Sequence, residues 1–254
     1  MPPAPAGAFH GQVVLVTGGT SGIGRAAALA FAASGAAVAI AGRDAGRGAD
    51  VVAAVEAAGA EALFLPVDLS HPSQAAEVVP AVLARFGRLD VAFNNAGYQE
   101  PRALLADQPA ATYDRVFDTN LRAVFLAMRA EIAAMLPRGG AIINNASVSG
   151  VRNPNPGLAL YSASKAAVIS LTRSAAMEYA ERGIRINAVS PGRVTTPMML
   201  ASKIADMEAV AAGLPLKRMG EADEVAAAVL WLASRASSFV VGHNLCVDGG
   251  FLSQ

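Results

Sequence analysis

The sequence predicts an α/β protein in which helices cover both faces of a parallel sheet. Short apolar runs alternate with Ala-rich helical segments along most of the 254 residues. These apolar runs are continuous, which is typical of strands buried on both faces. The first run, Val13–Val16, leads into the glycines Gly18, Gly22 and Gly24. We therefore expect a single doubly wound Rossmann-type domain with a seven-stranded parallel sheet. An eight-stranded barrel fits the length but needs one more strand.

Local signals place each element in turn. Asp44 can cap a helix, Pro72 suits a first helical turn, and glycines at 35, 59 and 87 can end helices. Strands are predicted at Val13–Val16, Ala37–Ala41, Glu61–Val67, Leu89–Phe93, Ala141–Asn145, Arg185–Val189 and Phe239–Val247. Helices are predicted from the glycine turn to near Gly35, and over Asp44–Gly59, Ser70–Gly87, Thr112–Met135, Leu160–Ala180 and Asp223–Ser234.

One domain is expected over residues 11–254, preceded by a loose tail at 1–10. The tail lacks the basic start and apolar core of a signal peptide. Residues 193–214 follow the sixth strand irregularly and contain Met198, Met199 and Leu200, so they predict an adaptable apolar substrate lid.

Composition narrows the function. The formal net charge is zero, which gives no electrostatic footprint for nucleic acid or an anionic membrane. The single cysteine, Cys246, excludes an internal disulfide and favours a reducing, cytoplasmic location. The three histidines lie far apart in the sequence, so no metal site is predicted.

The glycine turn predicts a nucleotide site. Gly18 would make the tight turn, Gly22 would let phosphates approach the backbone, and Gly24 would let helix and strand pack closely. The free N–H groups and positive end of the following helix suit a pyrophosphate.

Polar residues and glycines follow several predicted strands. Asp68 follows the third, Asn95 and Gly97 the fourth, Ser147 the fifth, and Pro191-Gly192 the sixth. Each alone is consistent with an ordinary turn. Because the carboxyl ends of parallel strands share one edge, their joint placement predicts a ligand site there.

Tyr161 and Lys165 are four residues apart on a predicted helix and share a face. A lysine ammonium about 5 Å from a phenol favours the phenolate by about 3 kcal/mol at an effective dielectric of about 20. We therefore expect Lys165 to lower the pKa of Tyr161 by about two units. The alternative is an ordinary surface pair.

These motifs together resemble the short-chain dehydrogenase/reductase family. The similarity runs from Gly11 to Gly250 and rests on Thr17–Gly24, Asn94–Gly97, Asn120, Ser147, Tyr161–Lys165 and Pro191-Gly192. One departure is that Ser147 and Tyr161 lie one residue further apart than in most members. The loop at residues 152–157 has room for this insertion, and Ser149 is an alternative polar contact.

The resemblance implies a role for each matching residue. Tyr161 would be the general acid and base, and Ser147 would hold the substrate oxygen. Lys165 would bind the nicotinamide ribose and lower the pKa of Tyr161. Asn120 would hold a water beside Lys165. The implied cofactor-binding residues are Gly18, Thr20, Ser21, Gly22, Ile23, Gly24, Arg43, Asp68, Leu69, Asn95, Ala96, Gly97, Tyr161, Lys165, Pro191, Gly192, Val194 and Thr196.

We therefore expect an oxidoreductase that moves hydride between NADP(H) or NAD(H) and a carbonyl or secondary alcohol. A 3-oxoacyl thioester reductase and a non-catalytic dinucleotide-binding scaffold are the alternatives.

The sequence favours NADP(H) as the cofactor, because Gly42 stands where an acidic residue would select NAD and Arg43 follows it. Asp44 and Ser21 count against this preference. The resemblance also implies a homotetramer built partly from the helix around Asp114–Met135 and the helix that carries Tyr161.

Overall fold

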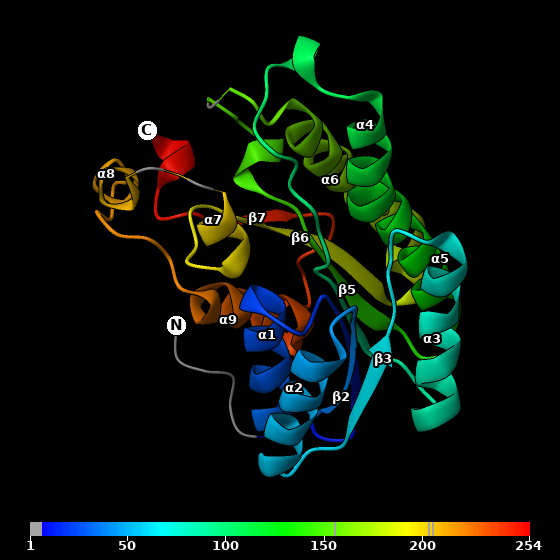
Figure 1. Cartoon of the computed structure of the whole chain (residues 1–254). Helices are drawn as coiled ribbons and strands as arrows, with labels where there is room; N and C mark the ends of the chain where they lie inside the picture. Colours follow the sequence, from blue (N-terminus) through cyan, green and yellow to red (C-terminus); the bar gives the residue numbers. More distant parts are fainter. Residues whose placement is uncertain (1–6, 155, 203, 205) are drawn as a thin grey trace.

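The computed structural model describes residues 7–154, 156–202, 204 and 206–254. It contains a seven-stranded, all-parallel sheet in the order β3-β2-β1-β4-β5-β6-β7 (Figure 1), which confirms the predicted fold class. The strands are β1 (Val13–Thr17), β2 (Ala37–Gly42), β3 (Ala62–Pro66), β4 (Val91–Asn94), β5 (Gly140–Asn145), β6 (Ile184–Pro191) and β7 (Asn244–Val247).

Helices connect these strands and end near the predicted signals. Asp44 caps α2 by accepting a hydrogen bond from the Arg47 N–H, and Gly87 ends α3 with a φ of 72°. The helices are α1 (Gly22–Ala33), α2 (Ala45–Ala57), α3 (Pro72–Phe86), α4 (Ala110–Phe117), α5 (Ala123–Met135), α6 (Ala159–Tyr179), α7 (Pro197–Ala201), α8 (Met207–Ala212) and α9 (Ala222–Ala233).

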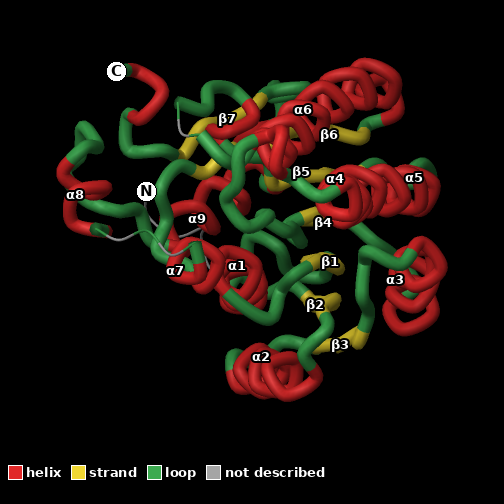
Figure 2. Tube along the Cα trace, turned by 45° about the horizontal axis from the view of Figure 1, so that its top comes forward, coloured by secondary structure: helices red, strands yellow, loops and turns green. Residues whose placement is uncertain are grey.

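The sheet lies between two helical layers, as Figure 2 shows, with α1, α2 and α9 on one face and α3 to α6 on the other. Successive strand side chains point to opposite faces, so Val14 and Val16 pack toward the first layer and Leu15 toward the second. The strand order reverses between β1 and β4. Ligands of doubly wound proteins bind beyond the carboxyl ends of the strands at such a reversal.

One predicted helix and one predicted strand differ clearly from the structure. The helix predicted over Thr112–Met135 is α4 and α5 joined by a π-helical turn at Asp118–Arg122. The last strand covers only Asn244–Val247, because Phe239 is fully exposed and Gly242 turns the chain with a φ of 67°.

The predicted loose tail also needs correction. Phe9 is buried and packs edge-on against Phe31, with 4.9 Å between the ring centroids, so the core reaches into residues 1–10. Residues 1–6 of that prediction lie outside the described residues. No helix in the described part of the chain is long and apolar enough to cross a lipid bilayer.

Candidate active site

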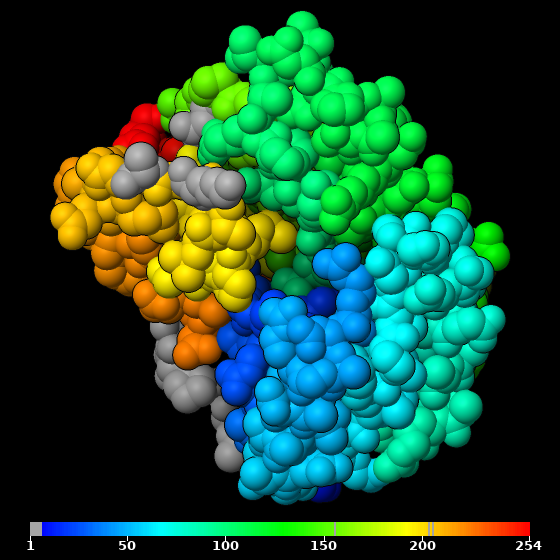
Figure 3. All heavy atoms as spheres, in the orientation of Figure 1, coloured from blue at the N-terminus to red at the C-terminus, as the bar shows by residue number. Residues whose placement is uncertain are grey.

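A cleft of about 310 Å³ opens at the carboxyl ends of the strands, a volume typical of small-molecule sites. In Figure 3 the surface is hollowed where the blue N-terminal region, the green middle region and the yellow segment around α7 meet. The predicted site residues that line it are Gly18, Thr20, Ser21, Gly22, Ile23, Arg43, Asp68, Leu69, Asn95, Ala96, Gly97, Ser147, Tyr161, Lys165, Pro191, Gly192, Val194 and Thr196. The two others, Gly24 and Asn120, lie outside the lining formed by the described residues.

The glycine turn after β1 has the geometry of an anion cradle. Gly18 and Gly22 have φ values of 63° and 52°, which L-residues with side chains rarely adopt. A Cβ on Gly24 would overlap the Gly18 carbonyl oxygen and the Asn95 side-chain amide, so only glycine fits there. Ser21 precedes α1 without a side-chain cap, which leaves first-turn N–H groups open toward the cleft. These features fit a pyrophosphate.

Hydrogen bonds join the loops that follow β1 and β4. The Thr17 hydroxyl accepts from the N–H groups of Asn95 and Ala96 at 3.0 and 3.2 Å. The Asn95 amide donates to the carbonyls of Thr17 and Gly18 and accepts from Asn145 at 2.9 Å. Asn95 therefore fixes the floor of the cleft at the reversal of the sheet.

Tyr161 and Ser147 meet inside the cleft. Ser147 lies two residues beyond the end of β5 at Asn145, and its side chain accepts a hydrogen bond from the Ser149 N–H at 3.1 Å. Tyr161 lies in the first turn of α6 and lines the cleft with Ser147, whose side chain favours the ionised form of the phenol. Ser147 and the alternative Ser149 both line the cleft, and Ser147 is the serine that acts on the Tyr161 pKa.

Lys165 is buried beneath this pair. Its Nζ donates to the Asn145 carbonyl at 2.6 Å and lies 5.7 Å from the Tyr161 ring centroid. A Cβ on Gly97 would lie 3.4 Å from this Nζ and 3.5 Å from Asn120 Oδ1, so Lys165 and Asn120 flank the Gly97 backbone. Asn120 is fully buried in the π-helical turn and bonds both backbone groups of Tyr98, at 2.7 and 2.8 Å.

The electrostatics of the pair differ from the prediction. Burial raises the pKa of Tyr161, and this outweighs the opposing effects of the Ser147 side chain and the Arg193 charge. Burial also lowers the pKa of Lys165 to about 8. The expected lowering of the Tyr161 pKa by Lys165 is therefore wrong for the chain alone, because desolvation destabilises both charged forms.

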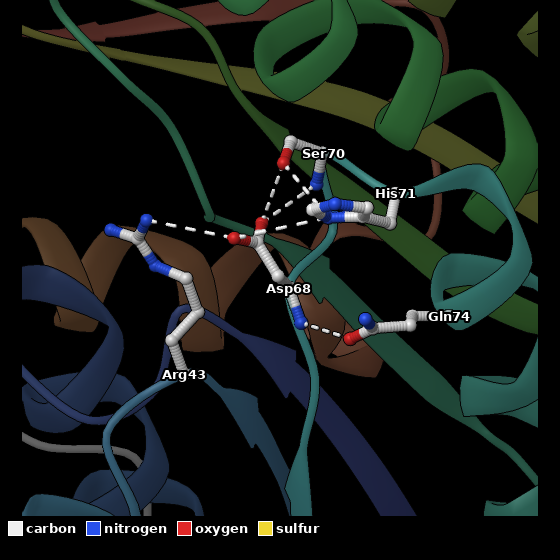
Figure 4. Close-up of polar contacts among 5 residues, drawn as sticks. All are labelled: Arg43, Asp68, Ser70, His71 and Gln74. Carbon is white, nitrogen blue, oxygen red and sulfur yellow. Dashed lines mark hydrogen bonds and ion pairs between the residues drawn. The ribbon is translucent and has the colours of Figure 1, made fainter.

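The opposite end of the cleft holds Arg43, whose Nη1 lies 3.8 Å from Asp68 Oδ2 (Figure 4). Partial burial raises the Asp68 pKa, but hydrogen bonds from Ser70 and the Arg43 charge outweigh it, so the pKa lies below its ordinary value. Beside Arg43, a Cβ on Gly42 would lie 2.8 Å from the Thr20 methyl group. Thr20 therefore occupies part of the space that the absence of a side chain at Gly42 leaves.

The predicted lid is ordered over the described residues and contains α7 and α8. Thr196 caps α7 by accepting from the Met199 N–H, and its methyl group lies close to Gly22. Met198 and Met199 line the cleft, whereas Leu200 is exposed.

Three charged residues in or beside the cleft lining were not named individually in the sequence analysis. Glu100 is buried, and its Oε1 accepts from the Tyr161 N–H at 3.0 Å. Arg47 lines the cleft near Arg43, and Arg193 lines it near Tyr161. Arg193 directly follows the Pro191-Gly192 pair, which was the available signal for it. Glu100 had none, because its position depends on a contact between segments 61 residues apart.

Comparison with known proteins agrees with this geometry. A family model described as enoyl-(acyl carrier protein) reductase matches residues 18–252. Cis-4-hydroxycyclohexanecarboxylate dehydrogenase of Sinomonas cyclohexanicum is 44% identical over 248 residues, covering 96% of this chain and 98% of that protein.

Solved structures show the same fold. Levodione reductase superposes with a TM-score of 0.92 at 38% identity, covering 96% of this chain and 99% of the other. A short-chain dehydrogenase from Burkholderia cenocepacia J2315, solved in complex with NADP, superposes with a TM-score of 0.90 at 36% identity, covering 95% and 98%.

The chain belongs to the short-chain dehydrogenase/reductase family. It is an oxidoreductase that acts on a small-molecule alcohol or carbonyl compound with a nicotinamide dinucleotide.

Proposed function

We propose that this enzyme interconverts a secondary alcohol and a ketone, with Tyr161 moving the proton at the substrate oxygen. The observation that carries this proposal is that Tyr161 and Ser147 line one cleft together with the anion cradle, and that the Ser147 side chain acts to lower the Tyr161 pKa. Ser147 is 8% exposed, so its hydroxyl can donate to a carbonyl oxygen with little competition from water. A substrate oxygen held between the two hydroxyls would receive the phenolic proton during reduction.

The cofactor residues fit a dinucleotide that spans the cleft. The turn at Gly18–Gly24 would bind the pyrophosphate, Asp68 and Leu69 would contact the adenine, and Lys165 would bind the nicotinamide ribose. When bound, the nicotinamide supplies or accepts the hydride. Asn120 would hold a water beside Lys165, because both side chains reach the Gly97 backbone.

For the cofactor we propose a preference for NADP(H). Arg43 is 69% exposed at the rim, and its 3.8 Å contact with Asp68 is loose enough to be exchanged for a phosphate. Arg47 already donates to Asp44 at 2.6 Å, so Arg43 is the better candidate. The Burkholderia relative in complex with NADP supports this choice.

We also propose a homotetramer, built partly on the α4–α5 surface. Tyr113 and Phe125 are 50% and 47% exposed there, and Tyr113 stacks on Phe117 with 4.3 Å between ring centroids. Exposed aromatic clusters of this kind mark interaction surfaces. The cytoplasmic location stays a prediction from the single cysteine.

The similarity to cis-4-hydroxycyclohexanecarboxylate dehydrogenase suggests an alicyclic substrate. The cleft has an apolar lining for such a ring, formed by Leu158, Met198, Met199 and Phe251. The second candidate is a 3-oxoacyl thioester reductase, which is supported by the 3-oxoacyl-[acyl-carrier-protein] reductase of Synechocystis sp., 38% identical over 248 residues.

Replacing Tyr161 with Phe tests the proposal. Turnover of a cyclohexanone by Tyr161→Phe should fall by about two to four orders of magnitude, the usual contribution of a positioned acid. Affinity for NADPH, measured by its fluorescence, should change little. Tyr179→Phe, near the other end of α6, is the matched control and should keep its activity. Near-normal turnover by Tyr161→Phe would show that another group moves the proton.

A further inference from the structure

Arg193 places a positive charge in the substrate half of the cleft. It follows β6 and lines the cleft with Tyr161 and Ser147, and its charge acts on the Tyr161 phenol. Its guanidinium lies 5.9 Å from the Phe251 ring centroid. Among the described residues, no carboxylate lies within ion-pair distance of the Arg193 guanidinium, and no side chain or backbone group forms a hydrogen bond with it.

This charge is costly without an anionic partner. Partial burial lowers the pKa of Arg193, and the nearby positive charge of Arg102 lowers it further. A partly desolvated guanidinium that lacks a partner loses water contacts without replacing them. An anion supplied by a ligand would remove this penalty and could accept two parallel hydrogen bonds.

The neighbouring arginines are already engaged. Arg102 donates to the Pro156 carbonyl at 3.0 Å, and Arg152 donates to the backbone oxygen of Gln254 at 2.7 Å. Neither of them belongs to the described cleft lining, so Arg193 is the guanidinium that faces the cleft beside Tyr161, and one guanidinium matches one carboxylate better than a multiply charged phosphate. The Glu100 side chain accepts a hydrogen bond from the Tyr161 N–H. Its carboxylate therefore disfavours an anionic group of the substrate close to the reacting carbon.

We propose that Arg193 binds a carboxylate of the substrate, so that the enzyme's substrates are alicyclic hydroxy acids and keto acids. The carboxylate lies at Arg193, the carbon skeleton lies on Phe251, Leu158 and the lid methionines, and the reacting oxygen lies at Tyr161 and Ser147. This inference rests on the proposed oxidoreductase function and adds the substrate's charge to it.

The test compares two ketones that share one ring and differ in charge. The purified full-length enzyme with NADPH is given 4-oxocyclohexanecarboxylate or its methyl ester, and kcat/KM is measured for each. The wild-type enzyme should prefer the acid by about 10- to 100-fold, the range of a charge-assisted hydrogen bond. Arg193→Met should abolish this preference by losing activity on the acid and little on the ester. Arg193→Lys should restore part of it.

Matched controls separate this effect from damage to the fold. Arg138→Met removes an exposed arginine outside the cleft and should leave the acid-to-ester ratio unchanged. NADPH binding and the melting temperature of each variant show whether the protein is folded. If Arg193→Met does not fold, the ratio for the wild-type enzyme still decides, because an enzyme without a carboxylate site reduces the ester at least as well.

The outcomes also distinguish this inference from the proposed function. Equal activity of the wild-type enzyme on acid and ester, or an acid preference that survives in Arg193→Met, would overturn the role of Arg193 and leave the oxidoreductase intact. Equal loss on both ketones in Arg193→Met would show a structural role and also overturn it. If the acid, the ester and unsubstituted cyclohexanone are all inert while acetoacetyl-coenzyme A is reduced, the alicyclic substrate class fails and the carboxylate site fails with it.

Discussion

Glu131 should make the protein less stable as the pH rises. This residue lies in α5 and is fully buried against the sheet. Its Oε2 accepts from the Asn94 side chain at 3.0 Å, while its Oε1 has no partner among the described residues. Asn94 also donates to Asn144, which donates to Thr172 at 2.9 Å, so a chain of buried amides surrounds the carboxyl group. Burial raises the Glu131 pKa to about 8, against an ordinary value of 4.5.

The sign and size of the effect follow from these two values. Below about pH 4.5 the group is protonated in both states, so folding carries no ionisation penalty. As the pH rises, the unfolded chain ionises first, and stability falls until the folded pKa of about 8 is passed. At 1.36 kcal/mol per pKa unit, the loss is about 3 kcal/mol at pH 7. Glu131→Gln keeps the shape and a hydrogen-bond acceptor for Asn94 but cannot ionise.

Denaturant unfolding at a fixed protein concentration measures this effect. The difference in unfolding free energy between Glu131→Gln and the wild-type enzyme should grow in favour of the variant by roughly 3 kcal/mol from pH 5 to pH 8. Glu178→Gln, an exposed glutamate on α6, should show no such trend. A difference that stays constant over this pH range would mean that Glu131 titrates normally, and the reasoning would be refuted.

Three further results are expected. Gly24→Ala should lower stability by about 1–3 kcal/mol in a thermal melt, because its Cβ would overlap the Gly18 carbonyl, whereas Gly46→Ala meets nothing closer than 3.5 Å and should not. Arg43→Leu should lower kcat/KM about 10-fold or more with NADPH and little with NADH; equal losses with both would exclude a role in phosphate recognition. Light scattering at micromolar concentration should give four times the chain mass of 25.8 kDa, and a monomer would contradict the assembly.

The sequence by itself determined the fold class and the position of the cleft. Continuous apolar strand runs favour a parallel sheet that is covered by helices, and the polar residues that follow parallel strands share one edge of that sheet. The tight turn at Gly18 could be predicted from the sequence, because its backbone conformation excludes most residues other than glycine. The spacing of Tyr161 and Lys165 was readable because a helix places such residues on one face.

The tertiary structure alone decided how these residues are charged and what stands beside them. A four-residue spacing puts Lys165 near Tyr161, but the balance between attraction and desolvation depends on burial by other segments, and desolvation prevails. Thr20 fills space beside Gly42 because the β1 and β2 loops converge. Arg193 and Glu131 are ordinary charged residues in the sequence. They become informative because chain segments far apart in sequence pack around them, and the energy of a charge is set by its surroundings in space.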